Sequence, residues 1–376
     1  MNPSTSLNPQ QREAVETTRG PMLILAGAGS GKTRVIVHRI AHLIREQVPP
    51  SRIIAVTFTN KAANEMKERL SKMFGESGKG VHLSTFHSLG VRILRETIDL
   101  LGYHKNFVIY DSQDQLALIR NLMDEEGISE SLLIDPKSAQ QMIHHAKTRG
   151  TSPEELLVPN ALPRTRLAGQ LYRQYQDTLK GCNALDFEDI LNFCLKLFES
   201  HADKMQEIRD RFRYVMVDEY QDTNSVQYRL LKHLVRDHRN LCVVGDDDQS
   251  IYGWRGAEPG NLFQFEKDFP DVKVVRLEQN YRSTEVILKA ANALIENNSQ
   301  RMPKTLWSEK PGGELLGWIE AEDEVLETET VVRRIRLDIM RHNRKLEEYC
   351  ILYRSNFQSR VLEESLREAK LPYRVV

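Results

Sequence analysis

Eight consecutive residues, AGAGSGKT at 26–33, have the composition of a loop that can surround an anion. They follow the apolar run Met22-Leu23-Ile24-Leu25, which predicts a buried strand. Glycines permit backbone angles closed to other residues, so successive amide N–H groups can curl around an anionic oxygen. Lys32 adds a mobile positive charge, and the Thr33 hydroxyl can be a ligand for Mg²⁺. The spacing therefore predicts a loop that holds nucleotide phosphates.

The residues after this loop favour the same interpretation. Arg34 to Arg45 has helical periodicity, and such a helix would direct the positive end of its dipole at the phosphates. The alternative is a glycine-rich hairpin turn, which the strand, the Lys-Thr pair and the helix in register disfavour. The predicted phosphate-binding residues are Ala26, Gly27, Ala28, Gly29, Ser30, Gly31, Lys32 and Thr33.

A second polar element, VDEYQD at 217–222, follows the apolar run RYVMV. Carboxylates at the carboxyl end of a buried strand face the crevice in which ligands of open α/β sheets lie. We expect Asp218 to hold Mg²⁺, and Glu219 to orient and deprotonate an attacking water. The alternative is a solvated strand end.

A third element, VGDDDQSIYGWRGA at 244–257, also follows a short apolar strand. Gln249 in its polar half is a candidate sensor of the γ-phosphate. Tyr252 and Trp254 in its aromatic half can form a stacking platform for bases. Spacing alone leaves open the alternative that both aromatics are core residues.

Composition indicates the class of protein and the number of domains. The 376 residues are 40% hydrophobic and 28% charged, which predicts two or three folded domains of a large soluble cytoplasmic protein. The four cysteines are scattered, no apolar run is long enough to span a membrane, and residues 1–10 lack the pattern of a signal peptide. Lys plus Arg total 52 against 53 Asp plus Glu, so nucleic-acid binding has to be argued from local sites.

Apolar β-rich runs alternate with helical stretches, the pattern of a parallel sheet covered by helices. Between about 89 and 200 the strand signal nearly disappears, which predicts a helical insertion. The candidate strands are Met22–Leu25, Ile53–Phe58, Val81–Ser84, Tyr214–Val217, Leu241–Val244, Val272–Leu277 and Tyr349–Tyr353.

Together these motifs resemble the superfamily 1 DNA helicases of the UvrD/PcrA/Rep type, with the Rep type the nearest. The resemblance covers essentially the whole chain, and motifs in family order are far more specific than any one of them. Besides the three elements above, it depends on LNPQQREAV at 7–15, TFTNKAANEMKER at 57–69, STFHSLG at 84–90, ALDFEDI at 184–190, LEQNYRS at 277–283 and ILYRSNFQSR at 351–360.

The resemblance implies roles on the ATP side that spacing does not show. Gln11 would recognise the adenine edge, and Tyr281 would stack on the adenine ring. Arg282 would contact the γ-phosphate from the second motor domain, with Arg34 as further charge. Without the family context, Gln11 is interpreted as only a cap of the helix that it begins.

The resemblance also implies a path for single-stranded DNA. Phe58, Tyr252 and Trp254 would stack on successive bases, and Arg255 would brace the stacking loop. Without the family context, a structural role for His87 is the commoner one. Three further residues fall in motifs that line the path: Asn60, Thr85 and His87.

The implied fold is two RecA-like α/β domains with a helical insertion in the first. Domain 1A would be 1–88 and about 200–277, domain 1B 89–199, and a partial domain 2A 278–376. The implied function is that of an ATP-dependent 3′–5′ DNA helicase and translocase in replication and repair. Its partners would be single-stranded DNA, single-strand/duplex junctions and replication or repair proteins, with no membrane.

Two later family motifs have no counterpart in the sequence, which predicts an N-terminal portion with poor turnover and a less stable segment after about 278. Two alternatives stay open. One is an ATP- or DNA-binding module without turnover, and the other is the motor part of a helicase-nuclease.

Overall fold

The computed structural model describes residues 7–128, 134–258 and 260–376. These residues belong to two compact units, Met1–Gly313 and Glu314–Val376. The first unit contains every predicted site residue, and each unit is described below by itself.

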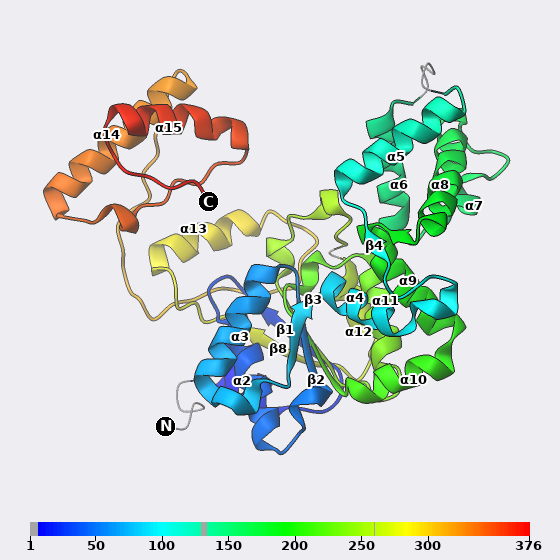
Figure 1. Ribbon diagram of the computed structural model, residues 1–376. Helices are drawn as coiled ribbons and strands as arrows, with labels where there is room; N and C mark the ends of the chain where they lie inside the picture. The colour runs from blue at the N-terminus through cyan, green and yellow to red at the C-terminus, as the bar shows by residue number, and fades with distance from the viewer. Residues whose placement is uncertain (1–6, 129–133, 259) are drawn as a thin grey trace. The chain divides into compact units, whose positions relative to one another are not determined.

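The centre of the first unit is a six-stranded sheet (Figure 1). Its order is β3-β2-β6-β7-β1-β8, and all neighbours run parallel. Six of the seven predicted strands are thereby confirmed, each to within one residue at either end. The strands are β1 (Met22–Ala26), β2 (Ile53–Thr57), β3 (His82–Thr85), β6 (Tyr214–Val217), β7 (Leu241–Gly245) and β8 (Lys273–Leu277).

Both faces of the sheet are buried at its four inner strands, which explains why β1, β2, β6 and β7 are nearly continuous apolar runs. The edge strands β3 and β8 are more exposed and more polar. Met22 and Ile24 of β1 belong to one hydrophobic cluster, whereas Leu23 and Leu25 belong to the other. The first face is covered by α1 (Pro9–Glu16), α2 (Lys32–Arg45) and α3 (Asn60–Phe74). The second face is covered by α4 (Phe86–Thr97), α9 (Phe187–Ser200), α10 (Ala202–Arg211), α11 (Ser225–Val235) and α12 (Gly260–Asp268).

The predicted helical interval contains a third hydrophobic cluster of its own. The interval also has one short parallel pair, β4 (Val108–Ile109) with β5 (Ala184–Leu185). Its helices are α5 (Ser112–Glu125), α6 (Pro136–Thr148), α7 (Pro153–Leu156) and α8 (Pro163–Gly181).

The two helices that flank this interval pack on the sheet rather than in the third cluster. A Cβ added to Gly90 of α4 would lie 2.6 Å from the Ile190 side chain of α9, so the two helices are in close contact. The proposed domain 1B limits of 89 and 199 therefore fall inside elements that serve the sheet.

Helix α13 (Glu285–Ile295) completes the described helices of the first unit, and the second unit contains α14 (Glu324–His342) and α15 (Ser359–Glu368). The prediction of a strand at Tyr349–Tyr353 is wrong, because these residues have no regular secondary structure. A strand requires a hydrogen-bonded neighbour, and the fully described Glu314–Val376 segment provides none. No helix in the described ranges is long and apolar enough to cross a bilayer.

A candidate nucleotide and nucleic-acid site

The order of the strands decides which loops meet. β6, β7, β1 and β8 are consecutive neighbours, and their carboxyl ends lead into the second element, the third element, the glycine-rich loop and LEQNYRS at 277–283. Because ligands of parallel sheets lie at the carboxyl edge, these four loops form one site. The carboxyl ends of β2 and β3 lie beyond them and lead to Phe58 and His87.

The glycine-rich loop at 26–33 has the backbone that its sequence predicts, with one correction. Gly29 and Gly31 have φ of 68° and 91°, angles that favour glycine. Gly27 has no positive φ, but a Cβ there would lie 2.1 Å from a terminal methyl of Leu306, so the Leu306 side chain would have to move. The Ser30 hydroxyl donates a hydrogen bond of 2.7 Å to the Gly27 carbonyl and closes the turn.

Lys32 begins α2 and lies at the centre of the polar contacts. Its Nζ is 3.0 Å from Oε2 of Glu219 and donates a 3.2 Å hydrogen bond to Oε1 of Gln249. Glu219 has φ 51° and ψ 45°, the left-handed region that non-glycine residues rarely occupy. Such strain is concentrated at functional sites, and here it accompanies the contact between the Glu219 carboxylate and Lys32.

Asp218 is buried at the end of β6, and its Oδ2 accepts a 3.3 Å hydrogen bond from the Thr33 hydroxyl. Burial and the neighbouring Glu219 carboxylate raise the pKa of Asp218 to about 7. A buried carboxylate next to a hydroxyl fits a hard cation, because the cation would supply the positive charge that favours ionisation. The donor set at Asp218 and Thr33 therefore fits Mg²⁺.

Gln221, which the sequence analysis does not single out, links two of the predicted elements. Its Nε2 donates a 2.8 Å hydrogen bond to the Glu219 carboxylate, and its Oε1 accepts a 2.9 Å hydrogen bond from the backbone N–H of Asp246. An amide is the side chain that can donate to one loop and accept from the next. In the sequence, its place two residues after Glu219 was the signal that could have indicated a role for Gln221.

The two residues predicted to hold adenine, Gln11 and Tyr281, both make hydrogen bonds at the start of α1. Gln11 is fully buried, receives the Asn8 N–H as part of a capping box, and donates a 2.9 Å hydrogen bond to the Ser30 carbonyl. The capping interpretation of Gln11 is thus realised together with a contact to the phosphate loop. The Tyr281 hydroxyl accepts a 2.9 Å hydrogen bond from Asn8, so the ring lies near the start of α1.

The segment 277–283 is held directly on the glycine-rich loop. The Asn280 side chain donates a 2.6 Å hydrogen bond to the Ala28 carbonyl, and the Tyr281 N–H donates to the Gly29 carbonyl at 3.0 Å. The Arg282 Cβ would lie 2.9 Å from a Cβ at Gly29, and Arg282 itself is exposed. Arg34 lies in the first turn of α2. Asn280 is the residue of this segment for which the sequence motifs predicted no role.

The predicted stacking residues share one groove of about 1220 Å³. Phe58, His87, Tyr252 and Trp254 all line it. The rings of Phe58 and Tyr252 are nearly parallel, with centroids 5.8 Å apart, and the Tyr252 and Trp254 centroids are 6.3 Å apart. Trp254 is 71% exposed, so the alternative that it is a core residue is wrong.

The remaining predicted groove residues lie nearby without lining it. Asn60 is the exposed first residue of α3, and buried Thr85 caps α4 through a 3.2 Å hydrogen bond from the Ser88 N–H. The side chain of Arg255 lies outside the described part of the structure.

Further lining of the groove comes from α6 and α9, which a buried ion pair joins. Nζ of Lys147 lies 2.6 Å from Oδ2 of Asp186 and 2.8 Å from Oδ1 of Asp189, two residues of ALDFEDI. The aspartates also form the capping box that begins α9. The basic residues Arg149 and Arg164 line the groove, and neither was predicted, because isolated arginines carry no local signal.

Comparisons with known proteins agree with this geometry. Residues 7–270 match the family described as the UvrD/REP helicase N-terminal domain, and residues 275–376 match the UvrD-like helicase C-terminal domain. The chain is 46% identical over 373 residues to the ATP-dependent DNA helicase PcrA of Bacillus subtilis strain 168, covering 99% of this chain and 50% of that protein.

Two further relatives show the same relationship. The PcrA helicases of Staphylococcus aureus strain Mu50 and Staphylococcus epidermidis strain RP62A are each 46% identical, over 98% and 99% of this chain and 50% and 51% of those proteins. The chain thus spans about half the length of the curated relatives that it matches. With a RecA-like parallel sheet and both family domains matched along its length, the chain belongs to the UvrD/REP helicase family.

Proposed function

We propose that this chain carries the nucleotide-binding and strand-binding parts of an ATP-dependent 3′–5′ DNA helicase that translocates on single-stranded DNA. The observation that carries the proposal is a single loop. Gln249 contacts Lys32 at the nucleotide side, and Tyr252 and Trp254, three and five residues later, line the groove. The short segment 249–254 therefore couples the nucleotide site at Lys32 to the groove.

At the nucleotide side, the contacts of Lys32 define what the residues do. The Lys32 ammonium is paired with the Glu219 carboxylate. A γ-phosphate competes for that ammonium, so its arrival releases the Glu219 carboxylate to accept a proton from the attacking water. Gln221, which donates to Glu219, keeps the carboxylate oriented. Arg282 adds positive charge from the neighbouring segment.

Thr33 and Asp218 would hold Mg²⁺, which when bound neutralises charge that develops on the phosphates. Asp218 must be ionised to do so, and the cation favours that form. Gln11 and Tyr281 would hold the adenine. In the groove, base stacking on an aromatic ring contributes about 1–3 kcal/mol per base, enough to grip a strand and release it stepwise. The substrates would be single-stranded DNA and junctions with duplex.

The test separates the nucleotide site from the groove. Lys32→Ala should abolish binding of a fluorescent ATP analogue and DNA-stimulated ATP hydrolysis, while affinity for a fluorescent oligo-dT remains. Strand displacement should require a 3′ tail. Binding without any DNA-stimulated hydrolysis would favour a binding module, and undiminished nucleotide binding by Lys32→Ala would refute the nucleotide site.

A further inference from the structure

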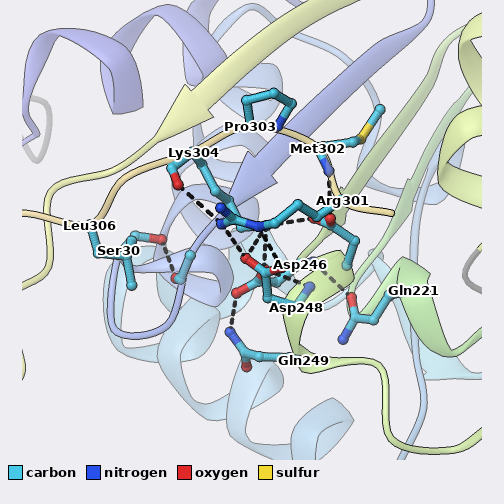
Figure 2. A network of polar contacts seen from close by, with 12 residues as sticks. Ser30, Gln221, Asp246, Asp248, Gln249, Arg301, Met302, Pro303, Lys304 and Leu306 are labelled. Atoms are coloured by element: carbon cyan, nitrogen blue, oxygen red, sulfur yellow. Dashed lines mark hydrogen bonds and ion pairs between the residues drawn. The ribbon is translucent and has the colours of Figure 1, made fainter. Parts of the chain in front are cut away.

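A short segment at 301–304 closes over the loop that follows β7 (Figure 2). Nζ of Lys304 lies 2.9 Å from Asp246, 2.5 Å from Asp247 and 2.7 Å from Asp248, measured to one carboxylate oxygen of each. Only 2% of the Lys304 side chain is exposed. One ammonium group thus contacts three consecutive carboxylates in a buried position.

The same segment makes further contacts with that loop. Arg301 forms a two-pronged pair with Asp248, with distances of 3.1 Å and 2.7 Å. The backbone N–H of Met302 donates a 2.7 Å hydrogen bond to Asp247. Such planar, paired contacts fix orientation as well as charge. The segment 301–304 and the loop are therefore held as one unit.

The charges explain why a lysine is needed. One oxygen of each of the three aspartates lies within 4.8 Å of the others, an arrangement of mutual repulsion unless a cation is present. Burial opposes the charge on Lys304, but the three carboxylates outweigh it and raise the pKa of Lys304. The ammonium of Lys304 thus provides the counter-charge at the place where the carboxylates converge.

One of these aspartates continues the contacts to the nucleotide side. Nε2 of Gln249 donates to Asp246, so Oε1 of the same amide faces Lys32, from which it accepts a 3.2 Å hydrogen bond. An amide can point its oxygen either way, and its neighbours decide which. Asp246, which Lys304 contacts, accepts from Nε2 and thereby sets the orientation of the Gln249 amide.

We propose that Lys304 is a positioning residue for Gln249, acting through Asp246. It fixes the amide with Oε1 on Lys32 and one N–H of Nε2 on Asp246, which leaves the second N–H to donate to the γ-phosphate. Recognition of the γ-phosphate then depends on the 301–304 segment. This inference rests on the proposed function, because it requires nucleotide at Lys32. The segment lies in the part of the chain matched by the C-terminal family domain, whereas Gln249 lies in the N-terminal one. The contact between the 301–304 segment and the Gln249 loop therefore couples the part of the chain matched by the C-terminal family domain to nucleotide binding.

A double-mutant cycle tests the proposal. The readout is the ratio of the dissociation constants for ADP and for a non-hydrolysable ATP analogue, both with Mg²⁺, for the whole chain. Gln249→Ala should lower this ratio about tenfold, the effect of one hydrogen bond to a charged group. Lys304→Met should lower it to a similar extent, and the double variant should show no additional loss. Lys289→Met, which removes an exposed lysine of α13, should leave the ratio unchanged.

Other outcomes overturn the proposal. A purely structural Lys304 would lower the melting temperature and weaken both nucleotides alike, leaving the ratio at the wild-type value. Equal ratios for wild type and Gln249→Ala, or fully additive losses in the double variant, would also refute it. If Lys304→Met does not fold, Asp246→Asn decides, because it keeps the side-chain shape and removes the charge between Lys304 and Gln249. An unchanged ratio in that variant would contradict the proposal.

A failure of the proposed function would give a different result from a failure of the positioning role of Lys304. If Lys32→Ala still binds nucleotide normally, the nucleotide site itself is wrong. If Lys32→Ala abolishes binding but Lys304→Met retains the wild-type ratio, only the positioning role is wrong.

Discussion

Replacing Glu219 with glutamine should strengthen nucleotide binding while it suppresses hydrolysis. The Glu219 carboxylate lies 3.0 Å from the Lys32 ammonium, so phosphates that bind at Lys32 must compete with an internal anion. The amide of Glu219→Gln keeps the shape, removes the competing charge and can no longer act as a base. The same variant therefore moves affinity and turnover in opposite directions.

The expected gain in affinity follows from the geometry of the pair. At 3.0 Å and an effective dielectric constant of about 20, the gross attraction is about 5.5 kcal/mol. Most of this is offset by lost hydration, and with side chains 10% and 35% exposed we expect a net contribution of about 1 kcal/mol. Releasing Lys32 from this pair should tighten nucleotide binding about fivefold.

The assay is a fluorescence titration with a non-hydrolysable ATP analogue and Mg²⁺, combined with steady-state ATP hydrolysis with and without oligo-dT. Loss of a general base should lower turnover by about 10²-fold or more. Glu46→Gln is the matched control, because it makes the same change at an exposed site after the last turn of α2. Weaker or unchanged nucleotide binding by Glu219→Gln would show that the Lys32–Glu219 pair does not compete with phosphate.

Three further predictions concern the groove, its wall and the second unit. Trp254→Ala should weaken oligo-dT binding about tenfold in fluorescence anisotropy, and Trp318→Ala, at the other strongly exposed tryptophan, should not; equal effects would contradict a stacking role. A hydrogen bond to Glu188 raises the pKa of His144, so its contribution to stability is present below about pH 6.5 and is lost as pH rises through the folded pKa. The melting temperature of wild type minus that of His144→Gln should therefore be larger at pH 6 than at pH 8. Expressed as free energy of unfolding, this pH-dependent difference should be less than about 1 kcal/mol. An equal difference at both pH values would rule out a stabilising His144–Glu188 pair. Backbone amides of Glu314–Val376 should exchange hydrogen faster than those of the sheet, because its apolar side chains are extensively exposed; equal protection would contradict this.

The sequence by itself determined the local chemistry of the site. A phosphate-binding loop depends on residues that are contiguous, so AGAGSGKT predicts backbone angles that favour glycine at Gly27, Gly29 and Gly31. The structure has a positive φ at Gly29 and Gly31 but not at Gly27. Strands buried on both faces are continuous apolar runs, and for that reason the four inner strands were found. The edge strands β3 and β8 were found as well, although they are less apolar. The seventh, Tyr349–Tyr353, has the composition of a strand but no neighbouring strand in its unit.

Only the tertiary structure decided which of these local elements meet. The strand order puts β6, β7, β1 and β8 side by side, and nothing in the local pattern encodes that order. The Leu306 side chain packs on Gly27, and Lys304 is buried where three aspartates surround it. Both contacts join residues far apart in the chain. Propensity and spacing act over a few residues, whereas packing and charge compensation act between whatever the fold brings together.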